Sequence, residues 1–201
     1  MSNEPMRIAV YGPESTGKTQ LAAQLAAHFG APLVAEYARE FWDQHGVITR
    51  EDIPGIAREQ WRREDAAALP RPIRPAPGLV GPAKEVCHII DDKRSSLVIC
   101  DTEALTTVLW SDLLYGTCSD AIRREADQRA KNYAFYLLLD IDVPFAPDPQ
   151  RCFPDPADRE KGLRLWRGAL DRRHLPYELI SGDWAQREQR AIAAVERLRS
   201  S

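Results

Sequence analysis

The fold is decided by the stretch Gly12-Pro13-Glu14-Ser15-Thr16-Gly17-Lys18-Thr19, which fits G-x-x-x-x-G-K-[ST], the P-loop pattern. Residues 7–11, just before it, are apolar and β-branched, as in a buried strand. After it, Leu21, Leu25 and Phe29 recur at the spacing of one helix face. A chance glycine-rich turn is the alternative. The order of strand, loop and helix favours a nucleotide-phosphate site.

Each residue type in this stretch has a mechanical reason. The glycines let the backbone turn, so that successive N–H groups converge on phosphate oxygens at the positive end of the next helix. The lysine reaches the β- and γ-phosphates, and the threonine hydroxyl can enter a Mg²⁺ shell. We therefore predict that a nucleotide triphosphate is bound by Gly12, Glu14, Ser15, Thr16, Gly17, Lys18 and Thr19.

Composition limits the class of protein. The 201 residues are enough for one domain with a sizeable core, and 44% hydrophobic with 28% charged residues is ordinary for a globular domain. The net charge of −3 argues against a nucleic-acid or membrane-surface binder. No apolar run approaches the roughly 20 residues of a membrane helix, and nothing in the N-terminal sequence suggests export, so we expect a cytoplasmic protein.

Strand and helix patterns alternate along the chain. Beyond the first strand, apolar runs predict strands at 31–35, 96–101, 135–140 and 177–180, and helical spacing appears at 36–44, 53–69, 105–113, 120–131, 159–173 and 186–198. Residues 70–82 hold five prolines and two glycines and predict an extended loop, and residues 144–158 predict an irregular, lid-like loop. The pattern predicts a single α/β domain over residues 1–201, with a five-stranded parallel sheet between two helical layers, as in P-loop NTPases.

Two carboxylates close predicted strands, where ligands of such sheets bind. Asp101 ends an apolar strand and has the form of the second acidic element that holds Mg²⁺; the alternative is that it caps the following helix. Glu36 follows the second strand, where a carboxylate could take the proton of an acceptor hydroxyl. Its alternative is a surface ion pair with Arg39, three residues on. Residues alone leave the role of Glu36 open.

The loop at 144–158 carries Arg151, with Arg159 just after it. Arginines over a phosphate site can neutralise charge that develops on the transferred group. Solvated loop charge is the alternative, and without further information it is the stronger one.

Taken together, these residues resemble the ribosylnicotinamide kinase domain of NadR-like proteins. The resemblance is carried, in order along nearly the whole chain, by G-P-E-S-T-G-K-T at 12–19, E-Y-A-R-E-F at 36–41, I-C-D-T-E at 99–103, P-F-A-P-D-P-Q-R at 144–151 and I-S-G-D-W-A-Q-R at 180–187. It implies phosphorylation of the ribose 5′-hydroxyl of nicotinamide riboside, with ATP and Mg²⁺ as cofactors.

The resemblance also implies roles for residues. Lys18 and Thr19 would hold the triphosphate and Mg²⁺, Glu36 and Asp101 would lie at the acceptor and the metal, and Arg151 would be the lid arginine. The adenine would lie near Gly182, Trp184 and Arg187. The acceptor would be bound by Glu36, Tyr37, Arg39, Thr106 and Trp110, although periodicity alone fits a Trp110 that only extends the core.

The chain departs from the family pattern in the lid and before Glu36. Phe145 replaces a tryptophan and Pro149 a glycine, and Ala35 stands where some relatives carry an aromatic residue. A platform for the nicotinamide ring would then come from Tyr37, Trp42 or Trp110. The H-x-G-H-type motif of an adenylyltransferase is missing, so the residues predict synthesis of the mononucleotide and not of the dinucleotide.

The sequence therefore favours a kinase with a small-molecule partner, nicotinamide riboside or a similar nucleoside, and no nucleic-acid or membrane partner. Two alternatives stay open. One is a P-loop kinase for another nucleoside or small alcohol. The other is a nucleotide-binding regulatory ATPase, which needs no acceptor site. The oligomeric state is not determined by the sequence.

Overall fold

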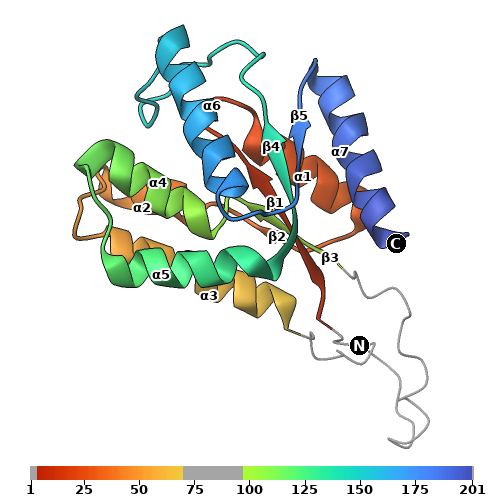
Figure 1. The fold of residues 1–201 in the computed structure, drawn as a ribbon, viewed down its shortest axis with the longest axis horizontal. Coiled ribbons are helices and arrows are strands. Elements are labelled where there is room, and N and C mark those ends of the chain that lie inside the picture. Colours follow the sequence, from red (N-terminus) through yellow and green to blue (C-terminus); the bar gives the residue numbers. More distant parts are fainter. Residues whose placement is uncertain (1–3, 70–96, 201) are drawn as a thin grey trace, which may run out of the picture.

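One parallel sheet forms the centre of the computed structural model, which describes residues 4–69 and 97–200 (Figure 1). Its strands run in the order β2-β3-β1-β4-β5, so β1 lies in the middle. Their bounds are Met6–Tyr11 (β1), Leu33–Val34 (β2), Leu97–Asp101 (β3), Tyr133–Leu139 (β4) and Tyr177–Ile180 (β5). The predicted five-stranded parallel sheet is confirmed. The predicted proline-rich loop at 70–82 lies outside the described residues.

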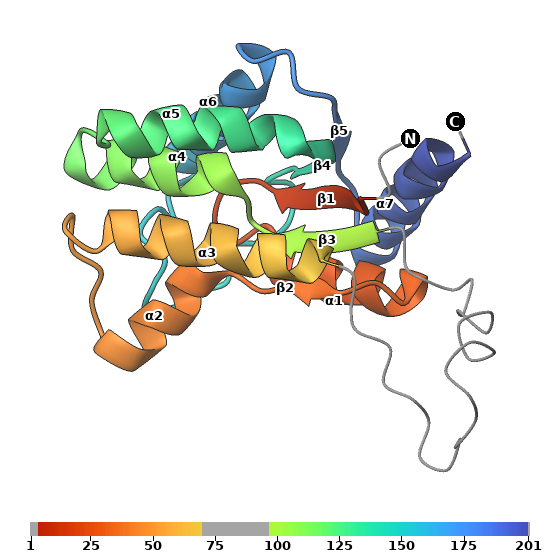
Figure 2. The same cartoon turned by 90° about the horizontal axis from the view of Figure 1, so that it is seen from below.

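Helices cover both faces of this sheet (Figures 1 and 2). One face carries α1 and α7, and the other carries α3, α4, α5 and α6. The helices span Lys18–Phe29 (α1), Tyr37–His45 (α2), Ile53–Ala68 (α3), Ala104–Tyr115 (α4), Asp120–Arg129 (α5), Pro156–Asp171 (α6) and Trp184–Arg199 (α7), with a short 3₁₀ turn at Ala130–Asn132.

Alternation along β1 explains the two layers. Ile8 and Val10 face the core beneath α1 and α7, whereas Ala9 and Tyr11 face the core beneath α3, α4 and α6. All four side chains are inaccessible to solvent. A strand buried on both faces needs an uninterrupted apolar run, and this is why the sequence shows one immediately before the P-loop.

Two of the boundaries that the structure corrects have a clear physical cause. The second strand covers only Leu33–Val34, because β2 is an edge strand and Pro32 has no N–H to donate to the ladder. The helix predicted to begin at residue 159 begins at Pro156, where a proline fits the first helical position. The Asp155 carboxylate caps it, accepting from the N–H of Ala157 at 2.8 Å. The irregular loop therefore ends at Asp155.

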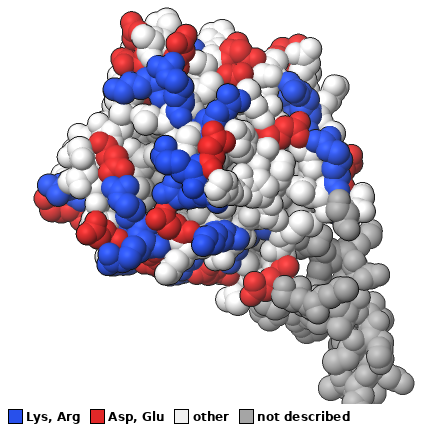
Figure 3. Space-filling model, viewed as in Figure 1, with Lys and Arg blue, Asp and Glu red and all other residues white. Residues whose placement is uncertain are grey.

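Charged side chains of both signs are interspersed over the described part of the face in Figure 3, without a broad area of a single sign. Among residues 4–69 and 97–200, no helix combines the length and the apolarity needed to span a membrane.

Candidate active site

The P-loop connects β1 to α1 and depends on two glycines with positive φ. Gly12 has φ 147°, and a Cβ there would lie 3.1 Å from the carbonyl oxygen of Leu139. Gly17 has φ 84° at the N-cap of α1, and a Cβ there would lie 2.5 Å from Cζ3 of Trp184. A larger residue would be strained at both positions. Its Cβ would collide with the Trp184 ring at Gly17 and would crowd the Leu139 backbone at Gly12. The N-cap of α1 makes no side-chain hydrogen bond, so backbone N–H groups of the first turn are available to an anion.

Lys18 lies over its own loop. Its Nζ donates to the carbonyl oxygen of Pro13 at 2.7 Å. Burial lowers the pKa of Lys18, and the negative charges of Glu36, Asp101 and Glu14 act against that shift. The Lys18 ammonium group is thus close to carboxylates that come from separate elements of the fold. This places it where the carboxyl ends of the strands meet, as the predicted phosphate site requires.

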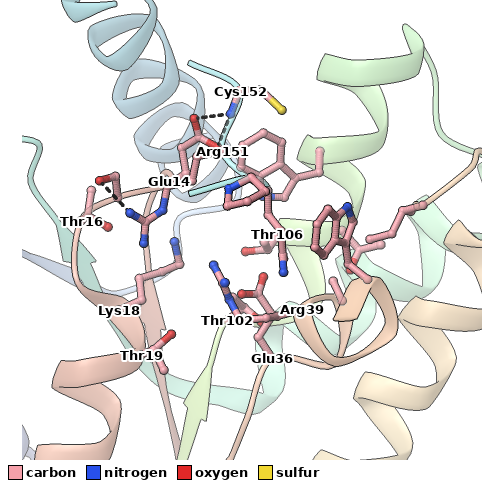
Figure 4. Close-up of a pocket in the computed structure, with 18 of the residues that line it drawn as sticks. Glu14, Thr16, Lys18, Thr19, Glu36, Arg39, Thr102, Thr106, Arg151 and Cys152 are labelled. Atoms are coloured by element: carbon pink, nitrogen blue, oxygen red, sulfur yellow. Dashed lines mark hydrogen bonds between the residues drawn. The ribbon is translucent and has the colours of Figure 1, made fainter. Parts of the chain in front are cut away.

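Glu36 occupies the N-cap of α2, directly after β2, and its side chain makes no capping bond. Burial raises the pKa of Glu36; attraction to Lys18 and Arg39 lowers it and the charge of Asp101 raises it further. The surface ion pair considered as an alternative is not formed, since Arg39 instead pairs with Asp148 at 3.2 Å. Figure 4 shows Lys18, Glu36 and Arg39 pointing toward the same space.

Asp101 is not the cap of the following helix. Glu103 caps α4, with its carboxylate accepting from the N–H groups of Leu105 at 2.6 Å and Thr106 at 2.9 Å. Asp101 is 2% exposed, and its Oδ1 has no hydrogen-bond partner. Burial raises its pKa, while a hydrogen bond from the Thr19 side chain lowers it. A buried carboxylate oxygen without a partner beside a hydroxyl fits the predicted cation site.

The loop between β4 and α6 is fastened to the P-loop. The Glu14 carboxylate accepts from the N–H groups of Cys152 at 3.0 Å and Phe153 at 2.6 Å. The Ser15 hydroxyl accepts from the N–H of Ala146 at 2.8 Å and from Arg151 at 3.5 Å. The Arg39–Asp148 pair connects the same loop to α2. The loop predicted to be lid-like therefore lies against the phosphate loop, with Arg151 beside Ser15.

A cavity of about 840 Å³ extends from the P-loop to the space between α2, α3 and α4. Its walls at the far end are apolar and aromatic, from Trp42, Ile48, Ile53, Trp110 and Leu114. Trp110 also packs on the core, with ring centroids 5.2 Å from Trp166. Trp110 therefore extends the core and also lines the cavity, while its contact with an acceptor stays a prediction.

The cavity gathers most of the predicted site residues, but some lie elsewhere. Those that line it are Glu14, Ser15, Thr16, Gly17, Lys18, Thr19, Glu36, Arg39, Thr106, Trp110, Arg151 and Trp184. Gly12, Tyr37, Asp101, Gly182 and Arg187 are not part of its lining. Tyr37 instead packs under the guanidinium of Arg63, 4.4 Å from the ring centroid.

Arg187 is used within the protein. It is 1% exposed and donates to the carbonyl oxygens of Thr16 at 3.0 Å and Gly182 at 2.8 Å. It also pairs with Asp142. Arg187 therefore holds the P-loop against the turn that precedes α7, and its influence on a bound nucleotide would act through the shape of that loop. The other arginine noted near the lid, Arg159, donates to the carbonyl oxygen of Val143 at 2.9 Å.

Sequence reasoning missed several lining residues. Thr102 lines the cavity and has φ 71°, a conformation that is rare for a β-branched residue. Ile53, Ile56 and Gln60 line it from α3. Their spacing of three and four residues indicates one helix face, but nothing in the sequence tells whether that face meets the sheet or a cavity.

Comparison with known proteins assigns the family. The model of one protein family, described as an AAA domain, matches residues 7–187. The chain belongs to this family. The matched residues include the P-loop, all but the first residue of β1 and the whole of β2, β3, β4 and β5. A comparison with curated proteins gives no match.

Solved structures share the fold. A NadR protein in complex with NR has a TM-score of 0.70 at 18% identity, over 96% of this chain and 51% of that chain. A NadR protein in complex with NAD and AMP-PNP has a TM-score of 0.66 at 19% identity, over 96% of this chain and 49% of that chain. A deoxyadenosine kinase from M. mycoides with bound dATP has a TM-score of 0.51 at 10% identity, over 95% of this chain and 99% of that chain. The chain thus spans about half the length of the NadR chains. At such identities the likeness establishes the P-loop kinase fold alone.

Proposed function

We propose that this member of the AAA domain family is an ATP-dependent kinase that phosphorylates the ribose 5′-hydroxyl of nicotinamide riboside. The observation that carries the proposal is the cavity itself, because one end holds the P-loop with Lys18 and Glu36 and the other end is aromatic. A regulatory ATPase needs no second compartment with a strand-end carboxylate at its entrance. The NadR structure in complex with NR, which has the same fold, supports the choice of acceptor.

Glu36 would be the general base of the reaction. As the acceptor oxygen forms its bond to the γ-phosphorus, the bond to the β-phosphate oxygen breaks, ADP leaves and Glu36 takes the hydroxyl proton. Burial raises the pKa of Glu36 above its ordinary 4.5 and so makes its carboxylate a better proton acceptor. Lys18 and Arg151 would stabilise the charge on the transferred group, because both line the cavity beside the phosphate loop.

Thr19 and Asp101 would hold Mg²⁺ together with the phosphate oxygens. The unpartnered, buried Oδ1 of Asp101 and the neighbouring Thr19 hydroxyl are hard oxygen donors of the kind that this ion prefers. When bound, the ion supplies charge neutralisation at the β- and γ-phosphates. Trp184, which is about half exposed, lines the cavity beside Gly17 and would contact the adenine.

The acceptor end suits a flat cationic ring. Trp42 and Trp110 present aromatic side chains to the cavity, and cation–π attraction would add roughly 0.5–2 kcal/mol to stacking. Arg39, the basic side chain of α2 that lines the cavity, is neutralised by Asp148. Tyr37, the third candidate for a stacking platform, lies outside the cavity lining. Trp42 and Trp110 therefore carry this part of the proposal.

Product analysis with Mg·ATP and a panel of nucleosides tests the proposal. We expect nicotinamide riboside to give the highest kcat/KM, with ADP released in a one-to-one ratio to the mononucleotide. Better phosphorylation of adenosine, uridine or thymidine would leave a kinase with a different acceptor. ATP hydrolysis that no acceptor stimulates would favour the regulatory ATPase.

A further inference from the structure

Gln60 provides the first link between the two strand ends that carry the predicted acceptor and metal carboxylates. Its Oε1 accepts from the backbone N–H of Tyr37 at 2.8 Å, and its Nε2 donates to Oε1 of Glu64 at 3.2 Å. Tyr37 is the first residue of α2, and its N–H would otherwise lack an intrahelical partner. Because α3 supplies this cap, the neighbouring Glu36 carboxylate stays available to the cavity.

Tyr133 provides the second link, from β4. Its hydroxyl donates to Oε2 of Glu64 and accepts from the backbone N–H of Ala104 at 3.2 Å. Ala104 is the first residue of α4, three positions after Asp101. The chain of hydrogen bonds thus runs from the start of α2 through α3 and β4 to the start of α4.

The two ends of this chain determine its polarity. Backbone N–H groups only donate, so the N–H groups of Tyr37 and Ala104 require acceptors in Gln60 and Tyr133. The Gln60 amino group and the Tyr133 hydroxyl hydrogen then both point inward to Glu64. Glu64 must accept from two sides, which an ionised carboxylate does and an amide does not.

Burial makes this arrangement costly to disturb. Glu64 is completely buried, and Gln60 is 3% exposed. Burial raises the pKa of Glu64 to about 6, while the hydrogen bonds from Tyr133 and Gln60 act in the opposite direction. In low-dielectric surroundings, a donor that loses its partner is left unsatisfied, so the network favours one geometry.

We propose that Glu64 is a positioning residue that, through Gln60 and Tyr133, holds the Glu36 and Asp101 carboxylates in place relative to each other. The role in catalysis rests on the proposed kinase function, in which Glu36 takes the proton and Asp101 holds the ion. Displacement of either group by about 1 Å would cost up to ~10²-fold in rate. No network residue other than Gln60 lines the cavity, and the contacts of Gln60 given above are within the protein.

Tyr133→Phe tests the proposal against a matched control, Tyr136→Phe. Both tyrosines lie buried on β4, and the Tyr136 hydroxyl donates to the carbonyl oxygen of Ala130 at 2.7 Å, away from the cavity. Tyr133→Phe leaves a Glu64 oxygen and the Ala104 N–H without this partner, whereas Tyr136→Phe leaves only one carbonyl oxygen without it. A larger loss of thermal stability is therefore expected for Tyr133→Phe, and the comparison rests on kcat in folded protein. We expect Tyr133→Phe to lower kcat about tenfold or more and Tyr136→Phe to retain kcat. Equal kcat values for the two variants would overturn the proposal.

Nucleotide binding gives a readout that needs no acceptor. If Asp101 holds Mg²⁺, displacing it should reduce the gain in ATP affinity that Mg²⁺ provides, measured calorimetrically with the non-hydrolysable analogue AMP-PNP. We expect a smaller gain for Tyr133→Phe and an unchanged gain for Tyr136→Phe. If the wild-type protein phosphorylates no nucleoside, the kinase proposal fails. The binding comparison still decides the positioning role, because an identical Mg²⁺-dependent gain in the wild type and in Tyr133→Phe would refute it.

Glu64→Gln provides a second variant in case Tyr133→Phe folds poorly. The new side chain keeps the shape but offers one acceptor and one amino group, so either Gln60 or Tyr133 loses its partner. We expect the same fall in kcat and in the Mg²⁺-dependent gain. If a folded Glu64→Gln variant kept the wild-type kcat and the wild-type Mg²⁺-dependent gain in affinity, the network would have no positioning role.

Discussion

The carboxylate of Glu14 accepts a hydrogen bond from the backbone N–H of Phe153 at 2.6 Å, which fastens the P-loop to the loop after β4. The same carboxylate accepts from the N–H of Cys152. Phe153 in turn stacks on Trp110, with ring centroids 6.1 Å apart. One carboxylate of the phosphate loop therefore holds the residue whose ring packs on Trp110 in the cavity wall.

Glu14→Gln should loosen the lid. Hydrogen bonds to an ionised acceptor are roughly twice as strong as neutral ones, so the N–H groups of Cys152 and Phe153 should open more often. We expect amide exchange at these two positions to be faster by up to about tenfold in the variant. Exchange in β1 should be unaffected and serves as the internal control. Unchanged exchange at 152 and 153 would mean that the lid is held by its other contacts.

Lys18→Ala should leave the fold intact and abolish turnover. The Lys18 side chain contacts the Pro13 carbonyl and the cavity and is absent from both core clusters. A cation aimed at the transferred phosphoryl group acts chiefly in the transition state. Lys131→Ala, an exposed lysine in the 3₁₀ turn before β4, is the control for loss of a positive charge. Near-normal activity of Lys18→Ala would refute the phosphate site.

Glu36→Gln should lower kcat by about 10²–10⁴-fold, the usual contribution of a general base, with little change in ATP affinity. Burial raises the pKa of Glu36 above 4.5, and the group acts only when ionised. Wild-type kcat should therefore fall as the pH drops through that raised pKa, and the residual activity of the variant should lack this acid limb. A tenfold loss of ATP affinity with little effect on kcat would instead make Glu36 a metal ligand.

Trp110→Ala and Trp42→Ala should each raise the KM for nicotinamide riboside more than they lower kcat, because a stacking platform contributes to binding in both ground and transition states. The KM for ATP should stay within about twofold of the wild-type value. This control shows that the phosphate-binding end of the cavity is undisturbed. Trp110→Ala should also lower the melting temperature, since Trp110 packs on Trp166. An unchanged acceptor KM in both variants would contradict the aromatic platform.

Glu103 should make stability depend on pH. Burial raises its pKa to about 8, against 4.5 for an ordinary glutamate. Between these values the folded protein holds a proton that the unfolded chain has lost, so the free energy of unfolding should fall as the pH rises from 4.5 through 8, by at most about 1.4 kcal/mol per unit. Glu103→Gln does not titrate, and its melting temperature relative to wild type should rise between pH 5 and pH 9. A constant difference would contradict the raised pKa.

Local sequence patterns were sufficient for the P-loop, the sheet and the positions of the strand-end carboxylates. The P-loop needs Gly12 and Gly17 because each has a positive φ and a close neighbour. Glycine is the residue type that meets both conditions, so this requirement can be seen in the sequence. Alternating burial along β1 likewise requires a continuous apolar run. Glu36 and Asp101 follow because parallel strands end at one edge of the sheet.

Tertiary structure decided what each polar side chain does, because long-range partners cannot be inferred from spacing. Arg39 pairs with Asp148 rather than with Glu36, and Arg187, predicted beside the adenine, supports the P-loop from within the protein. Helical spacing placed Gln60 and Glu64 on one face of α3. Only the tertiary structure brings Tyr133 of β4 to Glu64 of α3, since the two residues stand 69 positions apart in the sequence.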